Sequence, residues 1–184
     1  MQYLLPSLRL WLVSLIVCVL AYSALVLAFA QAVVPERANG SIVSVDGRPV
    51  GSRLIAQGFT SPRYFWPRPS APEYNAMGAA GSNKSPTSPD LVARAQETIT
   101  AYDASAANPI PADLVAASGG GLDPHVSLAG ALYQTPRVAA ARGIPEAELR
   151  AMVERLAQAP GGALAPDRIV NVLELNLALD AGAR

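Results

Sequence analysis

The pattern of apolar and charged positions divides the chain into an apolar amino-terminal run and a longer mixed region. Residues 10–30 are 21 consecutive positions without a charge, bounded by Arg9 before them and Glu36 after them. A helix of that length measures about 32 Å, close to the hydrocarbon thickness of a bilayer. The pattern predicts a short head over residues 1–9, a transmembrane helix over 10–32 and an extramembrane domain over 33–184.

The apolar run has a second interpretation, because the tripeptides at 28–30 and 30–32 have the small-x-small form that signal peptidase cleaves. A signal peptide usually has about 7 to 15 apolar residues, fewer than this run contains, so length favours a retained anchor. Arginines on both sides leave the orientation undecided by charge. A nine-residue head is simplest to leave in the cytoplasm, which predicts that residues 33–184 are exported.

The mixed region begins with two predicted strands and a stiff aromatic segment. Residues 41–45 and 48–57 fit strands joined by Asp46-Gly47, a dipeptide that readily takes the positive φ values of a tight hairpin turn. Residues 59–74 then hold five of the chain's eleven aromatic residues, interleaved with four prolines. Proline fixes φ and biases the preceding residue to extended geometry, so this segment is predicted to be rigid and irregular.

Start and stop signals predict two amphipathic helices. Ser88 before Pro89 is a cap followed by a first-turn proline, and apolar residues continue at helical spacing until the Asn-Pro pair at 108–109. The other helix begins at Pro145, with apolar residues at i, i+3, i+4 and i+7 from Leu149. Its remaining positions are mostly charged, so one face is expected to be buried and the other solvated.

Two shorter helices are predicted between them. Ser127 is expected to cap one that ends at Gln134. Pro136 is expected to open another that ends at Gly143.

The carboxyl-terminal stretch completes the fold prediction. After a Pro-Gly-Gly break, residues 169–173 fit a strand, and residues 174–181 fit a strand or a helix equally well. Strands first, helices in the middle and a late strand indicate an α+β fold. The prediction is one amino-terminal transmembrane helix followed by a single mixed α/β extramembrane domain.

Composition narrows the classes of function. The 14 basic and 14 acidic residues give a net charge of zero, so nucleic acid is not expected as a partner. Charged residues make up 15% of the chain, against roughly 25% in an average soluble domain, which agrees with a part embedded in lipid. The only cysteine, Cys18, lies in the apolar run, so an intramolecular disulfide and a cysteine zinc site are impossible.

Common catalytic motifs are missing from the sequence. The only lysine, Lys84, is not preceded by the glycine pattern of a P-loop, and no G-x-S-x-G elbow occurs. A single histidine disfavours a transition-metal site, so no metal is predicted. A membrane-tethered exported hydrolase using Ser118, Asp123 and His125 stays open as the alternative, because sequence does not exclude a histidine-centred triad.

The run from Ser118 through Gly119, Gly120 and Gly121 to His125 is the most unusual local feature. Adjacent glycines let backbone amides approach an anion closely, which makes a phosphate contact conceivable. The alternative is a tight bend between helices, and sequence alone favours it. His125 is expected to be a turn residue or a partner contact.

Four residues of the aromatic segment are candidate partner contacts: Tyr64, Phe65, Trp66 and Arg68. Stiff, exposed aromatic side chains provide contact area at low entropic cost. The alternative is that the rings pack onto the predicted hairpin. Arg68 fits a carboxylate of a partner or one of its own domain.

Five blocks in order along the chain resemble the C subunit of Kdp-type potassium-transporting ATPases. Any one block is weak, but five in the right order are specific. They are Pro62-x-Tyr-Phe-x-x-Arg-Pro-Ser-Ala, Gly81-Ser-Asn with Pro86-Thr-x-Pro, Ala117-Ser-Gly-x-Gly-Leu-Asp-Pro-His, Gln134-x-x-Arg-Val-Ala-x-Ala-Arg-Gly, and Val170-Asn-Val-Leu-x-Leu-Asn-x-Ala-Leu-Asp.

The chain departs from the common family pattern at Lys84-Ser85, Ser88, Gly120 and Leu128. In this family the glycine loop has been likened to the signature motif of ABC transporters and suspected of helping to hold nucleotide. The resemblance therefore implies a nucleotide contact at residues 118–121, and the departure at Gly120 weakens that residue-level expectation.

The resemblance also implies a function and a location. It implies a single-pass subunit of a bacterial inner-membrane complex, and the topology predicted from the short head places the bulk of the chain in the periplasm. The implied partners are a potassium-channel-like subunit, a P-type ATPase subunit and the lipid bilayer. It implies a non-catalytic chain without a cofactor of its own, because ATP and Mg bind the partner ATPase subunit. The implied role is a catalytic chaperone that raises the ATP affinity of that subunit and stabilises the complex for potassium import.

Overall fold

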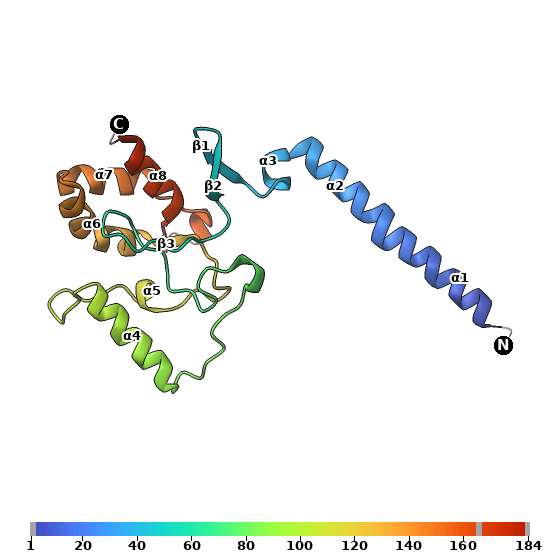
Figure 1. Ribbon diagram of the computed structural model, residues 1–184, viewed down its shortest axis with the longest axis horizontal. Helices are drawn as coiled ribbons and strands as arrows, with labels where there is room; N and C mark the ends of the chain where they lie inside the picture. Colours follow the sequence, from blue (N-terminus) through green and yellow to red (C-terminus); the bar gives the residue numbers. More distant parts are fainter. Residues whose placement is uncertain (1–2, 165–166, 183–184) are drawn as a thin grey trace. The chain divides into compact units, whose positions relative to one another are not determined.

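The computed structural model describes residues 3–164 and 167–182, and the chain divides after Val50 into two compact units (Figure 1). The first unit begins with a continuous helix made of α1 (Leu4–Leu15), a π-helical stretch (Ile16–Ala21) and α2 (Tyr22–Val33). Its side chains are exposed from residue 3 to residue 29. In the described residues this is the one helix long and apolar enough to cross a membrane.

The long helix ends where proline restricts the chain. Val34, immediately before Pro35, has φ −139° and leaves the helical region, as expected for a residue that precedes proline. The short helix α3 (Pro35–Ala38) follows.

The hairpin that the sequence predicts is present. It consists of β1 (Ile42–Val45) and β2 (Arg48–Ser52), which form a two-stranded sheet. Asp46 and Gly47 both have positive φ, +51° and +76°, as a two-residue turn of this kind requires. The second strand ends at Ser52, five residues earlier than predicted, because the Ser52 hydroxyl accepts a hydrogen bond from Leu54 N and turns the chain.

The second unit combines helices with a small sheet, which confirms the α+β prediction. The strands β3 (His125–Ser127) and β4 (Ile169–Asn171) pair antiparallel, with Val126 opposite Val170. In Figure 1, α6, α7 and α8 lie together, and α4 lies near α5. The helices are α4 (Pro89–Ala101), α5 (Ala112–Val115), α6 (Leu128–Arg142), α7 (Glu146–Leu156) and α8 (Val172–Gly182), with 3₁₀ turns at Ala76–Gly78 and Gly162–Leu164.

The core of this unit is formed by aliphatic side chains of the helices and the small sheet, together with Phe65 from the aromatic segment. Leu114, Leu149, Val153 and Leu175 are fully or almost fully buried, at 0 to 1% exposure. The helix α7 follows the predicted pattern, since Leu149 and Val153 face the core while Glu146 and Glu148 are exposed.

The prediction of two helices across 128–143 is wrong, because α6 is continuous through Pro136. Proline lacks the N–H that would bond to the Leu132 carbonyl one turn earlier. The Thr135 hydroxyl donates to that carbonyl instead, at 2.7 Å, so the Leu132 carbonyl keeps a hydrogen-bond partner. The two predicted ends are correct: Ser127 Oγ accepts from Gly130 N at 2.8 Å, and Gly143 has φ +69°.

The other helix limits differ from the predictions for local reasons. The helix α4 ends at Ala101, seven residues before Asn108, and the chain turns at Asp103, where φ is +51°. The strand β4 is two residues shorter than predicted, and residues 174–181 are helical. The Asn171 side chain accepts from Glu174 N at 3.1 Å and thereby caps α8, which converts the end of the strand into a helix start.

Candidate functional site

The aromatic segment passes between α6 and α8, where two buried side-chain amides hold its backbone. Trp66 N donates to Gln134 Oε1 at 2.8 Å, and Gln134 Nε2 donates to Trp66 O at 3.0 Å. Asn176 makes the same two bonds with the backbone of Phe65, at 2.8 and 3.0 Å. Each amide therefore provides the donor and the acceptor that a neighbouring strand would otherwise provide.

Two arginines of α6 hold the same segment from its side. Arg137 Nη1 donates to the carbonyls of Pro62 and Tyr64, at 2.9 and 3.1 Å, and its guanidinium lies 3.8 Å from the centroid of the Trp66 ring. Burial lowers the pKa of the Arg137 guanidinium. Arg142 Nε donates to the Arg63 carbonyl at 2.7 Å. Carbonyl oxygens, aromatic faces and a cation thus fix the course of the segment.

The predicted partner-contact rings also make contacts within the domain. Phe65 is fully buried in the core. The hydroxyl of Tyr64 donates to Asp180 Oδ2 at 2.9 Å, and Trp66 packs edge-to-face on Tyr102 with 5.2 Å between ring centroids. Tyr64 and Trp66 are half-buried, so part of each is accessible. Contact between these residues and a partner stays a prediction.

Arg68 and the residues after it attach the aromatic segment to the glycine loop, which we define as residues 117–125. Arg68 forms an ion pair with Asp123 at 3.5 Å and donates to the Ala117 carbonyl at 3.3 Å. The Ser70 hydroxyl donates to the Gly121 carbonyl at 2.6 Å. The carboxylate that pairs with Arg68 is therefore one of its own domain.

The three adjacent glycines of this loop have different surroundings. Gly121 is buried with φ +74°, and a Cβ placed there would lie 2.5 Å from the Ala80 carbonyl oxygen and from the Pro72 ring. Gly119 and Gly120 are exposed, and a Cβ at either would have no atom within 4 Å. The close packing around Gly121 explains why this position has a glycine. Nucleotide contact at Ser118, Gly119, Gly120 and Gly121 stays a prediction.

Asp123 connects the polar residues of the loop. Its Oδ1 accepts from His125 N at 3.0 Å and lies 3.0 Å from His125 Nδ1. Ser118 Oγ is buried with its residue and accepts from Asp123 N at 3.2 Å. In the described part of the chain, no hydrogen bond joins the Ser118 hydroxyl to the His125 imidazole, so these residues do not form the nucleophile and base pair of a triad.

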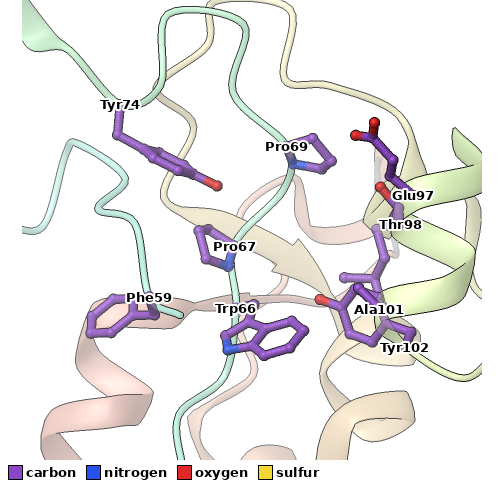
Figure 2. A pocket seen from close by; sticks show the side chains of 10 residues that line it. Phe59, Trp66, Pro67, Pro69, Tyr74, Glu97, Thr98, Ala101 and Tyr102 are labelled. Carbon is purple, nitrogen blue, oxygen red and sulfur yellow. The ribbon is translucent and has the colours of Figure 1, made fainter. Parts of the chain in front are cut away.

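A hollow of about 270 Å³ lies beside the aromatic segment, and we call it the aromatic hollow (Figure 2). Figure 2 shows Glu97 and Thr98 projecting from α4 on one side of it, and Phe59 and Tyr74 on the other. Its lining is formed by four rings, two prolines and residues of α4 and α5, namely Phe59, Trp66, Pro67, Pro69, Tyr74, Glu97, Thr98, Ala101, Tyr102 and Leu114.

The hydroxyl groups of the two tyrosines in the hollow have different partners. Tyr74 donates to the Arg68 carbonyl at 3.0 Å. In the described part of the chain, the Tyr102 hydroxyl has no hydrogen bond. Burial raises the pKa of both tyrosines. The sequence interpretation missed the contribution of α4, and the helical spacing that ends at Tyr102 was the signal for it.

Comparison with known proteins identifies the family. The family model described as "K+-transporting ATPase, c chain" (KdpC) matches residues 4–181. The chain belongs to the KdpC family. Membership confirms the resemblance found in the five sequence blocks. A KdpC chain is a non-catalytic subunit of the potassium-transporting ATPase, and this one has an amino-terminal helix capable of spanning a membrane.

Several curated KdpC proteins are similar to this chain over most of their length. The protein of Parvibaculum lavamentivorans is 57% identical over 181 residues, which cover 98% of this chain and 97% of that one. The protein of Sorangium cellulosum is 48% identical over 190 residues, covering all of both chains. The protein of Xanthomonas oryzae is 49% identical over 164 residues, covering 88% of this chain and 78% of that one. Each carries the name "Potassium-transporting ATPase KdpC subunit".

Proposed function

We propose that this chain is an accessory subunit of an ATP-driven potassium importer. In this role it stabilises the complex and raises the affinity of the ATP-hydrolysing subunit for ATP. The observation that carries the proposal is the family match from residue 4 to residue 181, which includes both the apolar helix and the rest of the chain. The partners in the proposal are a channel-like subunit that passes potassium and a P-type ATPase subunit that holds ATP and Mg.

In this proposal residues 10–32 cross the bacterial inner membrane, residues 1–9 stay in the cytoplasm and residues 33–184 lie in the periplasm. The exposed apolar side chains of the helix support a location in lipid or against partner helices. A helix also satisfies its backbone hydrogen bonds internally, as the bilayer interior requires.

The proposed topology determines how the chain acts on ATP. ATP is on the cytoplasmic side, so a periplasmic glycine loop does not touch it, and the effect on affinity is transmitted through the complex. Coupling of this kind typically changes an affinity by about 5- to 150-fold. Direct contact of residues 118–121 with nucleotide is the second form of the hypothesis, and it requires the opposite topology.

Recovery of the complex tests the stabilising role. A tagged ATPase subunit, expressed with the other subunits and extracted in mild detergent, is purified from cells that have or lack this chain. We expect the chain to be retained, and we expect the channel-like subunit to be lost more readily when the chain is absent. Equal recovery of the channel-like subunit from both cell types would contradict a stabilising role.

A further inference from the structure

The aromatic hollow carries one charged group, the carboxylate of Glu97. Glu97 is exposed, and within residues 3–164 and 167–182 its carboxylate has neither a hydrogen bond nor an ion pair. Among the described residues, the Tyr102 hydroxyl at the hollow also has no hydrogen bond. A hollow lined by rings and prolines therefore contains one free acceptor with a full negative charge.

We propose that the aromatic hollow binds a single basic side chain, an arginine or lysine, presented by a periplasmic loop of one of the larger subunits. The inference rests on the proposed function, since it names a docking point for the complex. The occupant is a protein side chain. An unoccupied hollow is the alternative that the experiment distinguishes.

Charge complementarity supports a cation. A carboxylate beside aromatic faces is the combination that binds guanidinium and ammonium groups, because the ring quadrupole and the negative charge both attract a cation. The Trp66 ring already accepts one guanidinium, that of Arg137, at 3.8 Å. Glu97 is the only charged residue among those that line the hollow. A phosphate group, in contrast, would be repelled by Glu97.

Size supports one side chain and not a nucleotide. Pockets for small molecules and cofactors usually measure about 300 to 1,000 Å³. The hollow measures about 270 Å³. This volume suits an anchor residue of a protein interface, and arginine is among the residues that most often serve as anchors.

The walls of the hollow are preorganised. The backbone of Trp66 is held on both sides by Gln134, and the Tyr74 hydroxyl is bonded to the Arg68 carbonyl. Pro67 and Pro69 restrict the backbone between these rings. Little side-chain or backbone freedom is lost when a ligand enters such a site, so a single anchor residue contributes more of its interaction energy to binding.

The test places a chosen charge at position 97 in the intact complex. Cys18 is the only cysteine, so a Cys18→Ala chain carrying Glu97→Cys has one reactive thiol. Methanethiosulfonate reagents then attach either a negative sulfonatoethyl group or a positive trimethylammonium-ethyl group. Retention of each adduct by the tagged ATPase subunit is measured over a range of salt concentrations. Glu154→Cys, at an exposed residue of α7 outside the hollow, is the matched control.

We expect the sulfonate adduct at position 97 to be retained like the Cys18→Ala parent. We expect the trimethylammonium adduct to bind about tenfold more weakly. Both adducts at position 154 should be retained as well as the parent chain. Methylguanidinium, added as a soluble probe, should weaken the binding of the parent chain to the complex. It should leave the binding of the trimethylammonium adduct unchanged. Thermal unfolding of each adduct in detergent checks that the fold is intact.

The two hypotheses fail in different ways. A parent chain that the larger subunits do not retain contradicts the proposed function itself. A parent that is retained, with two adducts at position 97 that bind equally, overturns the assignment of the hollow and leaves the proposed function standing. Equal effects at positions 97 and 154 overturn it as well, because they indicate long-range charge and not a site.

Discussion

At the scale of single residues, Gly120 and Gly121 are neighbours with different constraints. Gly121 has φ +74°, and an added Cβ would lie 2.5 Å from a carbonyl oxygen, whereas Gly120 is in open space. We expect Gly121→Ala to lower the free energy of unfolding by about 2 kcal/mol or more, since it combines left-handed backbone strain with a clash. Gly120→Ala should change it by less than about 0.5 kcal/mol. Denaturant titration of the full chain in detergent compares them, and equal losses would contradict the packing explanation.

Tyr102 provides a residue-scale prediction about pH. Burial raises the pKa of its hydroxyl above the ordinary value of 10.0, so the folded chain keeps a proton that the unfolded chain releases in alkali. The stabilisation is fully present below about pH 10 and is lost as the pH rises toward the folded pKa. Tyr102→Phe should therefore lose less stability than the parent above about pH 10. Free energies of unfolding at several pH values measure this, and identical slopes for the two chains would refute it.

At the scale of elements, the aromatic segment depends on side chains from helices far away in the sequence. Gln134→Leu would leave the part-buried backbone N–H and carbonyl of Trp66 without partners, at a cost of about 1 to 3 kcal/mol for each group. We expect a loss of about 3 kcal/mol in the free energy of unfolding. Gln158→Leu, at an exposed residue after α7, is the control and should be nearly neutral. A Gln134→Leu chain as stable as the control would show that these hydrogen bonds contribute little.

Elements with local signals could be predicted from the sequence, and those that depend on distant partners could not. The predictions of the Asp46-Gly47 turn and of the two ends of α6 are correct. Their signals, which are the turn dipeptide, the Ser127 cap and Gly143, act within a few residues. The break expected at Pro136 is absent because Thr135 bonds to the freed carbonyl, a compensation that helix propensity does not include. Residues 174–181, which the sequence left open between strand and helix, form part of α8 because Asn171 caps that helix.

In the candidate site, too, local features could be predicted from the sequence and those that depend on distant residues could not. The sequence pointed to Tyr64, Phe65, Trp66 and Arg68 as candidate partner contacts, and their contact with a partner stays a prediction. The sequence could not show that Gln134 and Asn176 would hold the aromatic segment, because a side-chain amide bonded to a distant backbone leaves no periodic pattern. Glu97 was missed for a related reason. A single exposed glutamate on a helix is ordinary until rings from other segments are placed beside it.

At the scale of the whole molecule, the chain combines an apolar helix with a unit whose loops are fixed by internal bonds. Arg68, Ser70 and Ser118 join the aromatic segment to the glycine loop, so the two family motifs pack together as one structure. A unit organised in this way suits a rigid docking element better than a mobile catalytic loop. In the proposed function, a rigid element anchored in the membrane changes the ATP site by shifting the conformations of the larger subunits.

In the proposed function, this chain raises the ATP affinity of the complex, and a partner subunit hydrolyses the ATP. The most direct test is the apparent KM for ATP of potassium-dependent hydrolysis by complexes purified without the chain, measured before and after adding back the full-length chain. We include Gly120→Ala as a variant of the exposed glycine loop. We expect the KM for ATP to fall at least about fivefold when the chain is added, and to fall equally with the Gly120→Ala chain. An unchanged KM for ATP after the chain has bound would show that the proposed role in ATP affinity is wrong.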